Sequence, residues 1–160
     1  MTLTAFAPHF PEAEMELSET AREHGLDNRC PVELIDNLAR TSWKAEEARK
    51  VLGIPCKVNS GYRSPAINEI VARGSSSTGV HPQGLAVDLL PLEGMDLLGA
   101  FAALQADPDF MQDVDQLIVE RGCLHIGLPR PGQEPRHELR RDEWIDGVRH
   151  YPLIGIWEPK

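Results

Sequence analysis

Two segments of this sequence carry side chains that could bind a divalent metal ion. The first is the run HPQGLAVD from His81 to Asp88. Imidazole nitrogens and carboxylate oxygens both coordinate zinc at ~2 Å. A carboxylate such as that of Asp88, in an apolar strand, is costly unless it is paired or bound to a metal. Gly84 would let the backbone turn from the histidine into this strand. The segment therefore predicts two metal ligands.

The second segment is DQLIVERGCLHIGL, from Asp115 to Leu128. We expect Arg121-Gly122 to form a two-residue turn between two strands. In that register Glu120 faces Cys123, and His125 lies on the same side of the ladder. Glu120 and His125 are then diagonal neighbours, at roughly 7–8 Å between backbones. This separation suits a general base and a metal ligand that share one water, so His125 would complete an open zinc site.

Spacing alone leaves a structural alternative for these residues. A histidine beside an apolar strand is more often a satisfied structural residue than a metal ligand. An aspartate at the end of a strand is more often part of a turn. On this alternative, His81 and Asp88 would only stabilise the fold.

The pattern around these residues predicts an α+β fold in which N-terminal helices pack on a small antiparallel sheet. The expected helices are 18–24, 31–52, 64–74 and 95–106. The expected strands are 54–59, 85–90, 116–120, 123–128 and 151–157. Asn28 is a candidate cap for the long helix, and Gly53 would end it. We expect one domain over 1–160, with an N-terminal arm over 1–18 and a C-terminal extension over 129–160.

Composition limits the classes of partner. The formal net charge of -9 argues against a nucleic-acid binder and against electrostatic adhesion to anionic membranes. No apolar run approaches the ~20 residues that cross a bilayer, and the N-terminus lacks the basic and apolar regions of a signal peptide. Three cysteines are too few for a disulfide framework. We therefore expect synthesis in a reducing cytoplasm without a signal peptide. We also expect the protein to be a monomer.

Several motifs in this order resemble the M15 family of zinc peptidases, and most of all its phage and prophage branch. The similarity runs from about Pro8 to Leu128. The motifs are Ser60-Gly61-Tyr62-Arg63-Ser64-Pro65 with Asn68, the segment from His81 to Asp88, Gln116-Leu117-Ile118 with Glu120, and Leu124-His125-Ile126. The resemblance implies the fold shared by D-alanyl-D-alanine peptidases and the Hedgehog signalling domain.

The resemblance also assigns roles. His81, Asp88 and His125 would bind one Zn²⁺ per chain, with Glu120 as the general base. Arg63 would stabilise the oxyanion or hold a substrate carboxylate. Tyr62 and Ser77 would contribute to substrate binding. The implied substrate is a peptidoglycan stem peptide containing D-residues, cut by carboxypeptidase or endopeptidase action. The protein would reach the wall after holin-type release or as a component of a phage virion.

Two departures from the family pattern keep a second function open. Gly79 stands where the family usually has Ser, and Gly122 where many relatives have an acidic residue. The alternative is a metal-containing binding or structural module of a phage tail with little or no catalytic activity. Cys30, placed just before Pro31 at a predicted helix start, offers a further alternative as a nucleophile. We expect it to be a partly buried thiol instead.

Overall fold

The computed structural model describes residues 4–72 and 79–160. The chain forms two compact units, made of the described parts of Met1–Glu46 with Val58–Asp88, and of Glu47–Lys57 with Leu89–Lys160. Helix α3 and strands β1 and β2 each begin in one unit and end in the other. The expectation of a single domain stays a prediction. Among the described residues, no helix is long and apolar enough to cross a membrane.

The first unit is mainly helical, and two of its helices begin at serine caps. Its elements are α1 (Glu12–Met15), α2 (Glu19–His24), η1 (Val32–Leu34), α4 (Pro65–Val71) and η2 (His81–Gln83). The hydroxyl of Ser18 accepts from the amide of Ala21 and begins α2, which ends at Gly25 with a φ of 62°. Ser64 begins α4 in the same way, with Pro65 at the first helical position. Both helix starts are as predicted.

The long helix α3 (Ile35–Leu52) begins after one 3₁₀ turn that follows Pro31. Gly53, with a φ of 69°, ends it as predicted. The prediction that Asn28 caps this helix is wrong. Its amide nitrogen donates to the carbonyls of Glu16 and Tyr62, and its oxygen accepts from the amide of Ser64. Asn28 therefore joins three segments of the chain. It does not cap α3, because its side chain is already bonded to backbone groups far away in the sequence.

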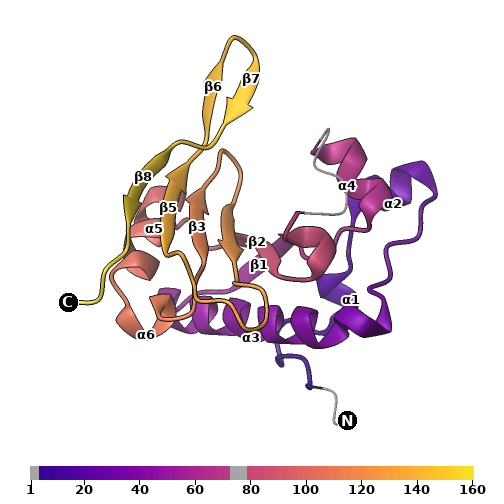
Figure 1. The fold of residues 1–160 in the computed structure, drawn as a ribbon, viewed down its shortest axis with the longest axis horizontal. Helices are drawn as coiled ribbons and strands as arrows, with labels where there is room; N and C mark the ends of the chain where they lie inside the picture. The colour runs from indigo at the N-terminus through magenta and orange to yellow at the C-terminus, as the bar shows by residue number, and fades with distance from the viewer. Residues whose placement is uncertain (1–3, 73–78) are drawn as a thin grey trace. The chain divides into compact units, whose positions relative to one another are not determined.

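A mostly antiparallel sheet has the strand order β1-β2-β4-β3-β5-β8 (Figure 1). The strands are β1 (Cys56–Ser60), β2 (Ala86–Pro91), β3 (Gln116–Val119), β4 (Leu124–Gly127), β5 (Glu138–Arg141) and β8 (Leu153–Ile156). β3 pairs antiparallel with β4 and parallel with β5, which pairs antiparallel with β8. In the second unit α5 (Leu97–Gln105), capped by Asp96, contacts β3 and the short α6 (Pro108–Met111). The mixed architecture agrees with the predicted fold class, except for the parallel pair.

The C-terminal extension contains strands that the sequence pattern did not predict. Besides β5, it forms a hairpin of β6 (Glu143–Ile145) and β7 (Val148–His150), which extends beyond the ends of β5 and β8 (Figure 1). These strands are short and mostly exposed, so they lack the alternation of apolar and polar residues that marks a half-buried strand. The dipeptide Asp146-Gly147 is the sequence signal that could have predicted this hairpin. Both residues have positive φ, as a type I′ hairpin turn requires.

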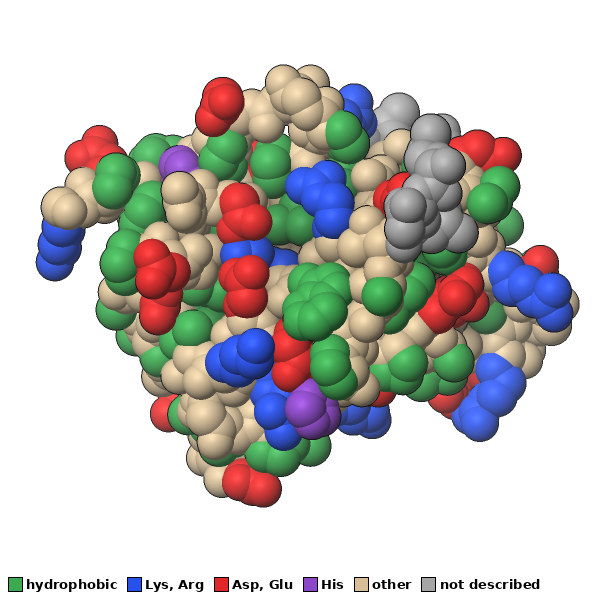
Figure 2. All heavy atoms as spheres, turned by 90° about the horizontal axis from the view of Figure 1, so that it is seen from below, with side chains coloured by type: hydrophobic (Ala, Val, Ile, Leu, Met, Phe, Trp, Pro, Cys, Tyr) green, Lys and Arg blue, Asp and Glu red, His purple; other side chains and the backbone are tan. Residues whose placement is uncertain are grey.

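Acidic and basic side chains are interspersed over the face shown in Figure 2. Although acidic residues outnumber basic ones in the chain, the described residues on this face therefore form no large, uniformly acidic patch.

Candidate metal centre

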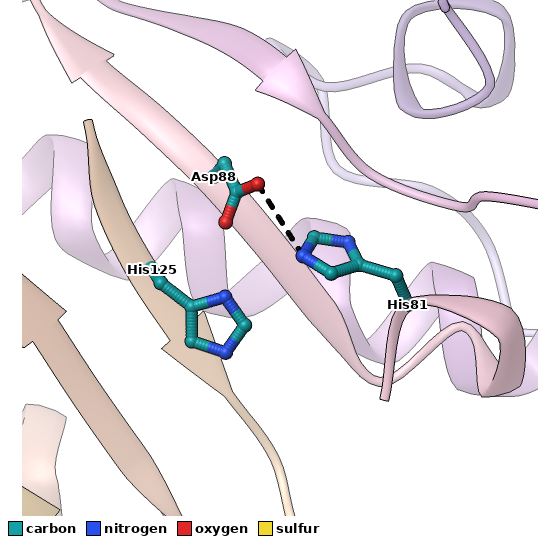
Figure 3. Close-up of side chains that lie close together, drawn as sticks. All are labelled: His81, Asp88 and His125. Atoms are coloured by element: carbon teal, nitrogen blue, oxygen red, sulfur yellow. Dashed lines mark ion pairs between the residues drawn. The ribbon is translucent and has the colours of Figure 1, made fainter. Parts of the chain in front are cut away.

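The three predicted metal ligands come together. His81, Asp88 and His125 each offer one ligand atom, and these atoms lie within 4.8 Å of one another. Figure 3 shows the three side chains directed toward one another. All three residues are buried, with 5%, 8% and 6% of their surface exposed. Two imidazoles and a carboxylate are a donor set typical of catalytic zinc, which keeps a fourth position for water.

The hydrogen bond of His81 shows how this set fits a cation. The Nδ1 atom of His81 lies 2.7 Å from the carbonyl oxygen of Gly61, which can only accept, so Nδ1 carries the proton. In the neutral ring, Nε2 then presents its lone pair to Oδ2 of Asp88, 3.3 Å away (Figure 3). Two acceptors at this separation repel each other unless a proton or a metal ion lies between them. A carbonyl that fixes the tautomer of a histidine is a common partner of metal ligands.

The backbone around η2 holds His81 in place. Gly84 has a φ of 70°, which confirms the predicted turn between the histidine and β2. A Cβ at this position would lie 3.2 Å from the amide nitrogen of Leu38 and 3.3 Å from the carbonyl oxygen of Leu34. The carbonyl of Gly84 also accepts a 2.7 Å hydrogen bond from the hydroxyl of Thr41. A side chain at residue 84 would therefore push the histidine loop away from the helical segment beneath it.

Arg63 lies next to one of the candidate ligands. Its three nitrogens donate to the Ser60 hydroxyl at 3.0 Å, the Asn68 side-chain oxygen at 3.4 Å and Oδ2 of Asp88 at 3.3 Å. Arg63 and Asp88 also line a pocket of about 240 Å³ whose other wall includes Ser18 at the start of α2. The guanidinium is thus held at the edge of a space open to a ligand. Its predicted role toward the oxyanion or a substrate carboxylate stays a prediction.

The other two predicted substrate contacts stay predictions as well. Tyr62 is only 2% exposed, and burial raises the pKa of its phenol. Its backbone amide donates to the carbonyl of Met15 at 2.8 Å. Ser77 lies outside the described residues.

The turn that carries Glu120 has the predicted register. Ile118 pairs with His125 and Val119 with Leu124, and the amide of Glu120 donates to the carbonyl of Cys123 at 2.9 Å. Oε2 of Glu120 accepts a 3.6 Å contact from the thiol of Cys123. One ligand atom each of Asp88, Glu120 and Cys123 lies within 4.8 Å of the others. The structure thus brings a carboxylate and a thiol close to Asp88, while the role of Glu120 as base stays a prediction.

Sequence reasoning missed Arg149, on β7. Its Nη2 donates to Oε2 of Glu120 at 3.1 Å and to Oδ2 of Asp142 at 2.9 Å. Although burial lowers the pKa of Arg149, the carboxylates of Glu120 and Asp142 raise it above its ordinary value. The Asp146-Gly147 dipeptide could have predicted the hairpin. No local signal identifies a partner 29 residues from Glu120.

Cys30 is a poor nucleophile. Burial, together with the nearby carboxylate of Glu16, raises the pKa of its thiol to about 12. A thiol that stays protonated at neutral pH cannot begin cysteine-dependent hydrolysis. The structure therefore supports the expected inert thiol.

The sequence matches the Peptidase M15 family over residues 8–107. This is more than half of the chain, so the protein belongs to the M15 family of peptidases, whose members are typically zinc-dependent. The matched residues include Arg63, His81 and Asp88, whereas Glu120 and His125 lie beyond them. The assignment of these two therefore rests on the motifs around them and on geometry. Comparison with curated proteins gave no match.

Proposed function

We propose that this protein is a zinc-dependent peptidase that hydrolyses peptidoglycan stem peptides containing D-residues. The main support for this proposal is that ligand atoms of His81, Asp88 and His125 lie close together in a chain of the M15 family. The fold would be of the Hedgehog and D-alanyl-D-alanine peptidase type, and the protein would be encoded by a phage or prophage. It would be made in the cytoplasm and act on the cell wall after holin-type release or as a virion component.

The chain's own groups have distinct tasks in this proposal. When bound, zinc supplies Lewis-acid polarisation of the scissile carbonyl and increased acidity of a water molecule. Glu120 takes the proton of the attacking water and passes it to the leaving amine. Arg63 donates to the carbonyl oxygen as negative charge develops, or to a carboxylate of the substrate. Its fixed fork of donors supports either use.

The test is mass spectrometry of defined muropeptides after incubation with the zinc-loaded protein. We expect release of D-alanine or a cut within the stem peptide, and at least about 100-fold slower product formation by a zinc-loaded Glu120→Gln control. The mass of the products also distinguishes carboxypeptidase from endopeptidase action. Cleavage of ordinary all-L peptides with no cleavage of muropeptides would refute the proposed substrate.

A second candidate function is a binding or structural module of a phage tail. Two observations favour it: the glycines at positions 79 and 122 where relatives have functional side chains, and the ion pair that ties Glu120 to Arg149. A zinc-loaded protein that binds muropeptides without changing their mass would support this alternative.

A further inference from the structure

A pocket of about 300 Å³ in the second unit lies against the proposed general base. Glu120 and Arg121 at the turn after β3, Arg141 and Asp142 at the end of β5, and Trp144 on β6 form much of its wall. All five residues lie beyond residues 8–107, the part of the sequence that matches the family, whereas Leu97 and Leu98, which also line the pocket, lie within it. The charged wall of the pocket and Trp144 are therefore features of this chain's C-terminal region.

The carboxylates of this pocket have ion-pair partners in the described part of the chain, whereas its guanidinium groups do not. Both of its carboxylates, Glu120 and Asp142, are bonded to Arg149, which does not line the pocket. The guanidinium groups of Arg121 and Arg141 form no ion pair with any residue that the structure describes. Two guanidinium groups outside any ion pair among the described residues thus share one pocket in a protein whose net charge is -9.

The rest of the wall is apolar. Trp144 is 47% exposed, and the guanidinium carbon of Arg121 lies 5.3 Å from the centre of its ring. Leu97 and Leu98, in the first turn of α5, line the pocket as well. A guanidinium stacked on an indole keeps its plane fixed and its edge available for bonding. The pocket therefore combines the guanidinium of Arg121, held on the indole, and the exposed guanidinium of Arg141 with apolar surface for an aliphatic chain.

We propose that this pocket is a substrate subsite that binds a carboxylate-bearing residue of a peptide. Arg121 and Arg141 would bond the carboxylate, while Trp144 and the two leucines contact its aliphatic part. Since Glu120 belongs to the same wall, a peptide held there passes directly beside the proposed base. The identification of the ligand as a substrate rests on the proposed function, whereas the binding of a peptide carboxylate does not.

The test is calorimetric titration of the zinc-free full-length protein, in which binding is measured without turnover. Two stem-type peptides are compared that differ only in one side-chain carboxylate, free in the first and amidated in the second. We expect the free carboxylate to bind about fivefold more tightly, the upper end of the range for an exposed ion pair. In the double variant Arg121→Gln, Arg141→Gln the two peptides should bind equally. Each single variant should lose part of the preference, so the test holds even where the double variant does not fold.

Arg40→Gln is the matched control, because it removes an exposed arginine that does not line the pocket. This variant should keep the full preference. Equal binding of both peptides by the wild type, or an unchanged preference in the double variant, would overturn the proposal. Displacement of the free-carboxylate peptide by an equal concentration of inorganic phosphate would show a general anion site and would also overturn it. Because no zinc is present, these outcomes are independent of whether the zinc-loaded protein hydrolyses muropeptides.

Discussion

The two sides of the candidate centre are held in place by different kinds of interaction. His81 is fixed by a backbone carbonyl, that of Gly61, and is 5% exposed. Glu120 is fixed by the side chain of Arg149, which is 32% exposed and comes from the β6–β7 hairpin. A buried bond to backbone is protected from solvent, whereas a partly exposed ion pair is screened by water and salt.

Because of this difference, we expect that some substitutions remove the metal and others reduce turnover while the metal stays bound. Damage to the His81 side should remove the metal and with it all activity. Damage to the Glu120 side should leave the metal in place and reduce only the rate. The following substitutions test this division, beginning with the largest expected effect.

Asp88→Ala should abolish both zinc binding and hydrolysis. It removes one of three predicted ligands, and it leaves the largely buried Arg63 without its carboxylate partner. Elemental analysis after zinc reconstitution and dialysis measures the metal content, with wild type expected to hold one ion per chain. Asp109→Ala, at an exposed aspartate on α6, is the control and should keep its metal. Stoichiometric zinc in Asp88→Ala would exclude this residue as a ligand.

Glu120→Gln should keep zinc and fold while turnover falls by roughly 100-fold or more, as expected for loss of a general base. Glutamine preserves size and hydrogen bonding but cannot accept the proton. The measurement is the initial rate of muropeptide hydrolysis at saturating zinc. Near-normal hydrolysis would remove Glu120 from the mechanism. Asp115 is a weak candidate to replace Glu120 as the base. Arg136 donates to its carboxylate at 2.6 Å, and its backbone is bonded to Gly127 and Glu138.

Arg149→Ala should reduce turnover about tenfold without loss of zinc, the size expected when one hydrogen bond to a charged group is removed. Glu120 would lose the donor that fixes its Oε2 atom. Arg149→Lys retains a charged donor and should recover most of the rate, which a purely structural role in the hairpin does not require. The control is Arg140→Ala, which breaks an ion pair with Glu138 within β5. Equal losses in Arg149→Ala and Arg140→Ala would indicate general destabilisation.

Cys123→Ser should have the smallest effect, with turnover within about twofold of wild type, as for substitutions that keep the local contacts. A hydroxyl can still donate to Oε2 of Glu120, where the thiol lies at 3.6 Å. Zinc stoichiometry should not change, since we predict that Cys123 is not a ligand. Loss of zinc in this variant would place the thiol in the coordination shell.

The grouping of His81, Asp88 and His125 was predicted from their motifs and the resemblance to M15 peptidases, whereas the other predicted parts of the molecule depend on short-range rules. The turn at Arg121-Gly122 determines which residues of β3 and β4 face each other, and Ser18 and Ser64 begin helices through bonds to amides three residues away. The role of Asn28 and the pairing of Arg149 with Glu120 could not be predicted. Each depends on groups more than ten residues apart, which only the packed chain brings together.

The position of Asn28 has a consequence for the order of folding. Its side chain bonds residues 12, 34 and 36 positions away, including both Tyr62 and Ser64, which flank Arg63. The shape of the loop around Arg63 is therefore fixed only after long closures of the chain, and such contacts form slowly. We expect refolding of the metal-free chain to be limited by docking of this N-terminal segment, with zinc uptake as a late event that reports its completion.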